Sequence, residues 1–287
     1  MAQPISTDLV GQAYDPVAVG WQDFDVQLYA LGVGCKPEAE LDFLYENRGP
    51  KVLPTFAVIP SMNVMTSAVS QLQINLAMLL HGEQSVTLHR PLPSRFKGQG
   101  QARISEVWDK GKAAVVGVES TLSDADGPLC TSHATLFIRG AGGFGGERGP
   151  SAADTTVPVP DRPADHVIED QTRPEQAALY RLSGDRNPIH IDPQFARFGG
   201  FERPFLHGLC TYGYAGRAAL QALCGGDPAR LLALGGRFSA QVYPGDGVTT
   251  RIWHLDSGQA LLQVESADGE VVFSNGLVHF SEESAPA

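Results

Sequence analysis

The chain shows the same order of hydrophobic and polar positions twice. In both stretches an apolar segment with helix formers precedes several segments in which apolar and polar residues alternate, and short turns with Asp, Gly or Pro separate them. Alternation with a period of two predicts strands that bury one face, and glycine in the turns permits the positive φ of tight hairpins. The pattern predicts a helix followed by antiparallel strands in each half.

In the first half we place the helix at residues 74–80, after an apolar segment at 53–60 that prolines bound and a strand at 41–46. A Pro/Gly-rich loop at 91–100 separates the first two of the strands that follow. These strands are predicted at 85–89, 102–108, 113–122 and 129–138. In the second half the helix begins near Gly208, and its strands are predicted at 238–243, 248–255, 260–266 and 271–280.

Matching turns support an internal duplication. An Asp-x-Gly turn at 109–111 corresponds to one at 256–258, and the Asp-Gly pair at 126–127 corresponds to the pair at 268–269. Short turns recur by chance in any series of hairpins, but here the helix, the strands and the turns share one order. The sequence therefore indicates that the chain consists of two related units.

A segment with the composition of a linker lies between these units. Residues 140–163 are rich in Gly and Pro and carry few residues that could form a core. We predict two domains, 8–140 and 158–283, in which one helix is wrapped by one antiparallel sheet. Two such sheets placed next to each other would form one layer with both helices on the same face.

Composition adds limits to this architecture. At 287 residues, 43% of them hydrophobic and 18% charged, the chain can bury two modest cores. We see no apolar run of the roughly 20 residues that a membrane span needs and no secretion signal, so we expect a cytoplasmic protein without a membrane partner. The four cysteines are scattered, which favours free thiols over disulfides or a structural zinc site.

The charge balance bears on possible partners. With 21 basic and 32 acidic residues the formal net charge is −11, and no Lys/Arg-rich run interrupts it. Nucleic acid is therefore not an expected partner. A polyanionic ligand would have to be met by a few local cations instead of by the overall field of the protein.

The candidate chemistry lies in the run Tyr-Arg-Leu-Ser-Gly-Asp-Arg-Asn-Pro-Ile-His at 180–190. It places the acid Asp185, the amide Asn187 and the imidazole His190 within six residues, and Gly184 allows the backbone to turn tightly before them. Standing alone, such a run is most often a capped turn. Joined to a helix start seventeen residues after His190, it is more typical of an active site.

That helix start supplies a different group. Gly208 opens an apolar helix with an unusually small face. The first N–H groups of a helix have no intrahelical acceptor and lie at the positive end of the macrodipole. The N–H of Gly208 is therefore suited to receive an oxygen that becomes negative during a reaction.

Together, the 180–190 run and the Leu-His-Gly-Leu segment at 206–209 resemble the signature of the type 2 enoyl-CoA hydratases, MaoC-like hydratases with a double hot-dog fold. The resemblance implies an α+β fold in which two helix-wrapped sheets form one continuous layer. It also implies an (R)-specific 2-enoyl-CoA hydratase of fatty acid metabolism, which hydrates trans-2-enoyl-CoA reversibly to (3R)-3-hydroxyacyl-CoA without a metal or another cofactor. By analogy we expect a homodimer.

The resemblance also assigns residues. Asp185, Asn187, His190 and Gly208 fall on the catalytic positions of the family. The first half lacks a corresponding run before its own His-Gly pair, so we expect one active site per chain and a non-catalytic first half that contacts the acyl-CoA. The residues at the family's acyl-CoA contacts are His81, Gly82, Lys110 and Phe238.

Other interpretations remain. A hot-dog thioesterase, an acyl-carrier-protein dehydratase and a non-catalytic acyl-CoA-binding protein would share the fold, although a binder would not need an acid and a base placed together. A metal site formed by His190, Asp192 and His207 is disfavoured, because Pro193 and the long gap to His207 match no known ligand spacing.

Overall fold

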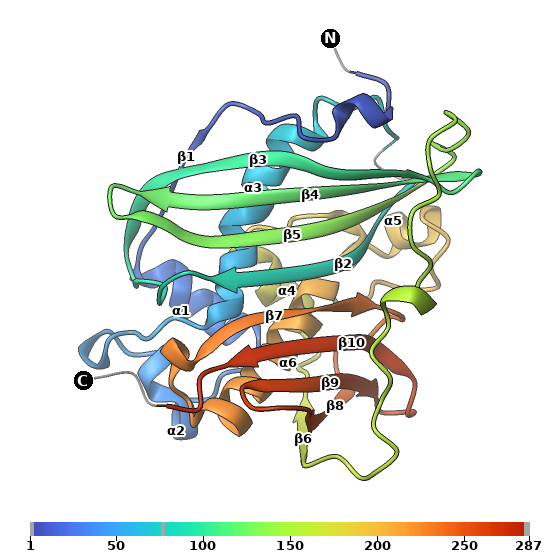
Figure 1. Ribbon diagram of the computed structural model, residues 1–287. Helices are drawn as coiled ribbons and strands as arrows, with labels where there is room; N and C mark the ends of the chain where they lie inside the picture. The colour runs from blue at the N-terminus through green and yellow to red at the C-terminus, as the bar shows by residue number, and fades with distance from the viewer. Residues whose placement is uncertain (1–2, 76–77, 284–287) are drawn as a thin grey trace.

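One continuous antiparallel sheet runs through the whole computed structural model, which describes residues 3–75 and 78–283 (Figure 1). The strands of its first half are β1 (Val17–Trp21), β2 (Leu79–Leu88), β3 (Phe96–Asp109), β4 (Ala113–Asp124) and β5 (Gly127–Arg139). Those of the second half are β6 (His166–Gln171), β7 (Leu231–Phe238), β8 (Gly247–His254), β9 (Gln259–Ser266) and β10 (Val271–Phe280). They are ordered β1-β3-β4-β5-β2-β7-β10-β9-β8-β6.

Two long helices, α3 (Val58–Val69) and α6 (Gly208–Cys224), lie on the same face of the sheet (Figure 1). The shorter α-helices are α1 (Asp23–Gly32), α2 (Pro37–Glu40), α4 (Gln176–Tyr180) and α5 (Pro193–Phe198). Single 3₁₀ turns occupy Thr7–Leu9, Leu41–Phe43, Glu46–Arg48, Pro54–Ala57, Ala153–Thr155, Arg181–Ser183, Pro188–His190 and Pro228–Arg230.

The two halves have the same topology. The spatial order β1-β3-β4-β5-β2 in the first corresponds to β6-β8-β9-β10-β7 in the second, and in each half the long helix comes between the first strand and the other four. The expected α+β double hot-dog architecture is confirmed, with both sheets joined in one layer. The outer strands β1 and β6 were not predicted from the sequence.

The position of the first helix was predicted wrongly. The structure begins α3 at Val58, inside the apolar segment at 53–60, while Leu79 and Leu80 belong to β2. Residues 76–77 of the helix predicted at 74–80 lie outside the described residues. The prolines that seemed to bound the segment start helical turns instead: Pro54 opens a 3₁₀ turn and Pro60 lies in the first turn of α3, where its missing N–H costs nothing.

Two predicted strands are also wrong. Residues 41–46 contain no strand, because Leu41–Phe43 form one 3₁₀ turn and a second begins at Glu46; of the strand placed at 238–243, only Phe238 is in a strand, as the last residue of β7. The Gly235-Gly236 pair lies inside β7, where it permits close packing. A Cβ added at Gly235 would lie 2.8 Å from Ser85 Cβ, and one at Gly236 would lie 2.3 Å from Phe273 Cζ. The loop predicted at 91–100 also ends early, since β3 begins at Phe96.

The pairing of β2 with β7 joins the two halves. It runs in register from Glu83 opposite Arg237 to Thr87 opposite Ala233. Arg237 also donates from Nε to Glu83 Oε1 at 2.8 Å, which fixes the register at one end. Because β7 follows α6 and β2 follows α3, this pairing brings the two long helices to the same region of the sheet.

The connecting segment, expected to be an unpacked linker, is tied to the first half. The carboxylate of Asp109, at the end of β3, accepts hydrogen bonds from the N–H groups of Gly111, Gly143 and Gly145, each at 2.8 Å. These three donors hold the pKa of Asp109 below its ordinary value. The glycines allow the backbone to wrap around the carboxylate, which the composition alone does not show.

A buried ion-pair cluster fastens the first half to the second. Arg217 on α6 pairs with Glu40 (3.1 Å) and with Asp170 on β6, and it donates to the carbonyl of Val33 at 3.0 Å. All three charged side chains are almost completely buried. Removing the cation would leave two carboxylates without their partner in a region of low dielectric constant.

We therefore expect Arg217→Met to lower the free energy of unfolding by about 3–5 kcal/mol, although methionine preserves much of the apolar stem. The matched control is Arg48→Met, because Arg48 pairs with Asp42 in an exposed bridge whose loss should cost at most about 1 kcal/mol. Urea unfolding at pH 7 measures both values. Equal losses for the two variants would contradict the role assigned to the buried cluster.

Candidate active site

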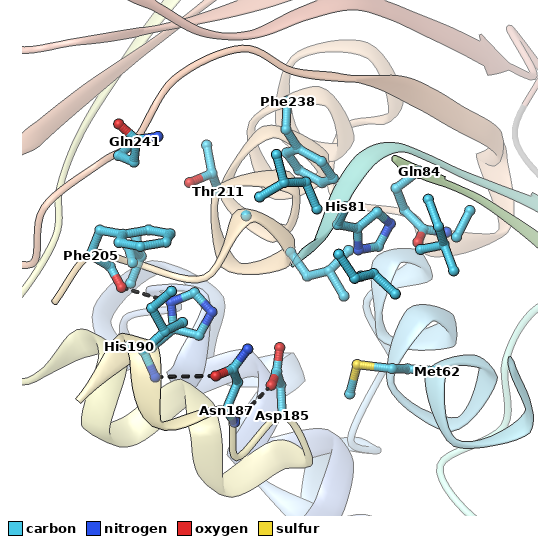
Figure 2. Close-up of a pocket in the computed structure, with 18 of the residues that line it drawn as sticks. Met62, His81, Gln84, Asp185, Asn187, His190, Phe205, Thr211, Phe238 and Gln241 are labelled. Carbon is cyan, nitrogen blue, oxygen red and sulfur yellow. Dashed lines mark hydrogen bonds between the residues drawn. The ribbon is translucent and has the colours of Figure 1, made fainter. Parts of the chain in front are cut away.

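A cavity of about 450 Å³ lies between the two halves. Helix α3 and strands β2 and β5 form one side of it, while the 184–190 turn, the start of α6 and the segment after β7 form the other. Figure 2 shows Asp185, Asn187 and His190 facing His81 and Phe238 across this space. Residues far apart in the sequence, from both duplicated units, therefore meet at one site.

The 184–190 turn is built as its composition suggests. Gly184 has a φ of +153°, a region that favours glycine. Asp185 Oδ1 accepts from the N–H of Asn187 at 3.1 Å, and Asn187 Oδ1 accepts from the N–H of Ile189 at 3.1 Å, capping the Pro188–His190 turn (Figure 2). These two local bonds bring the carboxyl and the imidazole to the same wall of the cavity.

The imidazole of His190 is held in one orientation. Its Nδ1 lies 2.9 Å from the carbonyl oxygen of Phe205 (Figure 2). A carbonyl can only accept, so Nδ1 carries the proton and the lone pair of the neutral ring is at Nε2. Burial lowers the pKa of His190 below its ordinary value. His190 is thus a neutral imidazole with a free basic nitrogen, as a general base requires.

A second buried histidine, His207, lies against His190. The ring centroids are 3.9 Å apart at an interplanar angle of 31°. Burial and then the neighbouring His190 lower the pKa of His207 to about 3. From the sequence, His207 was named only within the Leu-His-Gly-Leu segment of the resemblance and in a disfavoured metal site, and no periodicity or spacing distinguished it from an ordinary core histidine.

The metal site considered from the sequence is not assembled. Asp192 caps α5 instead, with Oδ1 accepting from the N–H of Gln194 at 2.8 Å. Ligand atoms of Asp185, His190 and His207 do lie within 4.8 Å of one another. However, the two rings are stacked on each other with an interplanar angle of 31°, an arrangement that does not favour the convergence of their in-plane lone pairs on one tetrahedral centre.

Gly208 begins α6 as predicted, with its Cα at the cavity. The carbonyl of His207 accepts from Cys210 (2.9 Å) and Thr211 (3.2 Å), so the regular helix bonding starts beyond Gly208. A Cβ added at Gly208 would lie 3.1 Å from the ring of Phe238. Any larger residue would therefore crowd the ring of Phe238 at the start of the helix.

Two of the predicted contact residues lie at the cavity. His81 on β2 and Phe238 at the end of β7 pack edge to face, with centroids 5.2 Å apart. Burial lowers the pKa of His81 to about 4, although the nearby carboxylate of Asp185 acts in the opposite direction. Within the described residues, the buried Nε2 of His81 has no hydrogen-bond partner.

The other two lie outside the cavity wall. Gly82 sits at a bulge of β2, where a Cβ would be 3.2 Å from the carbonyl of Thr135, instead of at a helix start. Lys110 is in the β3–β4 turn and donates from Nζ to the carbonyl of Pro150 at 2.8 Å. Its neighbour Asp109 lies on the same row of paired residues as Leu79 at the cavity. Three strand spacings, ~14 Å in total, separate these two residues.

Several wall residues were not predicted. Gln84 on β2 is buried, and its amide donates to Ser132 Oγ at 2.7 Å. Thr211 could have been found, because it follows Gly208 by three positions and shares its helix face. Met62 and Met65 on α3 could not, since the helix itself had been placed elsewhere.

Comparison with known proteins places this geometry in a family. Residues 20–140 match the family described as "MFE-2 hydratase 2 N-terminal domain", and residues 155–273 match the "MaoC like domain". The chain is 41% identical over 260 residues to "Enoyl-CoA hydratase ChsH3" of Mycobacterium tuberculosis, covering 87% of this chain and 90% of that protein. The chain belongs to the MaoC-like hydratase family.

Two further relatives extend the likeness. "Enoyl-CoA hydratase 2, peroxisomal" of Arabidopsis thaliana is 39% identical over 252 residues, or 81% of this chain and 82% of that protein. The crystal structure of a "MaoC-like dehydratase" from Phytophthora capsici superposes with a TM-score of 0.86 at 32% identity, covering 98% of this chain and 100% of the other. The family and the fold therefore agree over nearly the whole chain.

The neutral buried histidines predict a pH-dependent stability. The ordinary imidazole pKa is 6.5, but that of His81 in the folded protein is about 4. As the pH falls from 6.5 towards 4, the unfolded chain takes up a proton at this residue that the folded chain does not. His81 should therefore cost about 1.4 kcal/mol of unfolding free energy per pH unit in this window.

Urea unfolding at pH 7, 6 and 5 should accordingly show a shallower decline in His81→Gln than in the wild type. His89→Gln is the control, because His89 is exposed and its ring bonds to Thr131 Oγ1 at 2.9 Å. The control should follow the wild-type slope. An unchanged slope in His81→Gln would show that His81 is protonated in the folded protein.

Proposed function

We propose that this protein is an (R)-specific 2-enoyl-CoA hydratase, which hydrates trans-2-enoyl-CoA reversibly to (3R)-3-hydroxyacyl-CoA in fatty acid metabolism. The observation that carries the proposal is the meeting of Asp185, a neutral His190 and the start of α6 at Gly208 around one cavity. Relatives of similar length named enoyl-CoA hydratase and "3-hydroxyacyl-thioester dehydratase Y" support both directions of the reaction.

The proposed mechanism follows from the electronic demands of the reaction. Attack of water on C3 of the enoyl group moves negative charge to the thioester oxygen, and a proton must be added at C2. The N–H of Gly208, at the positive end of α6, stabilises that oxygen. Asp185 and the free Nε2 of His190 hold the water, take its proton and return one to C2. Asn187, fixed as a cap, orients the turn and offers its amide to the water.

The cavity is divided in the way that an acyl thioester requires. The reacting groups of the proposed mechanism belong to the second half, whereas α3 and the start of β2 contribute the apolar side chains of Met62, Met65, Val69 and Leu79. The acyl chain is proposed to extend along this apolar wall, where the flexible methionines accommodate different shapes. His81 and Phe238 close the wall beside the thioester.

The proposed reaction uses no metal or redox cofactor, and coenzyme A enters as part of the substrate. No helix in the described part of the chain is long and apolar enough to span a membrane. A cytoplasmic location remains a prediction. A homodimer also remains one, and it rests on analogy with the fold.

Incubation with crotonyl-CoA tests the function directly. Loss of the enoyl absorbance without release of free thiol, with (3R)-3-hydroxybutyryl-CoA as the product, is the expected result. Release of thiol would identify a thioesterase instead. Binding of the substrate without any change would identify a non-catalytic acyl-CoA-binding protein.

Asp185 and His190 are expected to act on the same water. Asp185→Asn and His190→Ala should therefore each lower kcat for crotonyl-CoA by roughly 10²–10⁴-fold, the usual contribution of a general acid or base. The double variant should be scarcely slower than the poorer single variant, because a water that has lost one partner is no longer aligned for the other. Circular dichroism checks that each variant is folded. Losses that multiply, or a single variant with near-normal activity, would refute the shared-water mechanism.

Lys110 is expected to meet a phosphate of coenzyme A at a distance from the reacting atoms. Lys110→Ala should raise KM for short and long acyl-CoA substrates alike and leave kcat nearly unchanged, since the contact is equal in the ground and transition states. Lys112→Ala, two positions along the same exposed turn, is the control and should change neither value. A change confined to kcat would contradict this assignment.

A further inference from the structure

His207 lies behind the site, not in its wall. It is the residue before α6, it is 1% exposed, and its ring is packed between Tyr180 and His190. Its Nε2 lies 3.2 Å from the carbonyl oxygen of Asp185. Its Nδ1 is buried and, within residues 3–75 and 78–283, has no hydrogen-bond partner. The proposed mechanism gives this side chain no task.

Each of the two stacked histidines donates a hydrogen bond to the segment that carries the other. His190, in the 184–190 turn, donates to the carbonyl of Phe205, which lies just ahead of α6. His207, at the start of α6, donates in the opposite direction to the carbonyl of Asp185 in the turn. Each ring is therefore anchored on the segment that carries the other. Together the His190–Phe205 and His207–Asp185 bonds, called the clasp below, hold the turn against the start of the helix.

The clasp also decides the protonation of both rings. Because carbonyl oxygens only accept, the proton lies on Nδ1 of His190 and on Nε2 of His207. The low pKa of His207, about 3, keeps its ring neutral beside His190. His207 therefore places no positive charge beside the base, and the lone pair of His190 Nε2 remains available.

We propose that His207 is the positioning residue of this site. Through its bond to the Asp185 carbonyl and its stacked ring, it fixes the acid and the base relative to the N–H of Gly208, the next residue in the chain. The inference rests on the proposed hydratase function, which needs these three groups held together within a fraction of an ångström. His207 touches no reacting atom, so its effect is transmitted entirely by Asp185 and His190.

Packing alone does not account for a histidine here. An aromatic ring without nitrogen would fill the same space against Tyr180 and His190, and it would not bury an acceptor such as His207 Nδ1, which has no partner among the described residues. What such a ring could not supply is the donor to Asp185. The position therefore calls for a flat ring and an N–H at the place of Nε2.

A matched pair of amides separates these requirements. Glutamine can place its amide nitrogen near the position of histidine Nε2, whereas asparagine is shorter and places it near Nδ1. We expect His207→Gln to stay within a few-fold of the wild-type kcat for crotonyl-CoA. His207→Asn and His207→Phe, which lack the donor to Asp185, should lose about 10–100-fold, as is typical when a supporting hydrogen bond is removed. KM should change little in all three.

The pH profile of kcat/KM distinguishes a positioning role from a merely structural one, because a merely structural role would leave the profile unchanged. The titratable groups around His207 are His190, Asp185, Tyr180 and Arg181, on the turn and the two short helical segments before it. In His207→Asn the loosened His190 ring becomes better solvated, so the acid limb of kcat/KM should move to higher pH. In His207→Gln it should stay in place.

The tautomers can be observed without turnover. In ¹⁵N NMR of the resting wild type, His207 should be neutral at pH 5 and protonated on Nε2, and His190 should be protonated on Nδ1. Observation of the opposite tautomers would overturn the proposal even if the enzyme is active. This measurement keeps the inference separate from the function, which the wild-type assay with crotonyl-CoA decides alone.

His89→Gln, at an exposed histidine remote from the cavity, is the control and should match the wild type. The proposal is overturned if Asn and Phe at position 207 retain wild-type kcat, or if Gln loses as much as Asn. Should the Phe variant fail to fold, the Gln and Asn comparison still decides. Thermal unfolding of each variant shows whether a loss of kcat reflects a loss of fold.

Discussion

The pairing of β2 with β7 is the constraint on which the rest of this structure depends. Without it the two half-sheets would each expose an unpaired edge, and the cavity would lose one of its walls. Gly235 makes the pairing possible, because any side chain there would meet Ser85. The register set by Glu83 and Arg237 places His81 near Phe238, at the point where β7 ends. Sheet continuity and the shape of the site therefore have one cause.

The two halves share one fold but contribute different groups to the cavity. Both halves have the same order of strands around one helix, but only the second carries the turn with Asp185 and His190. The first half contributes α3 and the start of β2 as an apolar wall. In the proposed mechanism a single chain thus contains a reacting side and a side that holds the acyl group, and the buried Arg217 cluster links the two halves.

The wrong predictions came from interpreting local sequence patterns without the distant residues that pack against them. Pro60 was taken as a boundary, although in the first turn of α3 a proline breaks no hydrogen bond. The strand of this region was placed at 238–243, although Gly235 and Gly236 allow β7 to run earlier in the chain and to approach β2 and Phe273. The glycines after residue 140 were taken as a free linker, although they wrap the carboxylate of Asp109. In each case a partner distant in the sequence decided the local structure.

The sequence by itself determined the order of helix, strands and turns and the meeting of Asp185, Asn187 and His190, because these depend on periodicity and on contacts within a few residues. The α+β double hot-dog class came from the resemblance of the 180–190 run and the 206–209 segment to a known family. Only the tertiary structure decided the position of α3, the packing of His81 on Phe238, and the clasp made by His207. These rest on the strand register and on segments brought together from far apart, such as Arg237 and Glu83, 154 residues from each other. No local pattern encodes such contacts, since their free energy arises only when both partners are buried together.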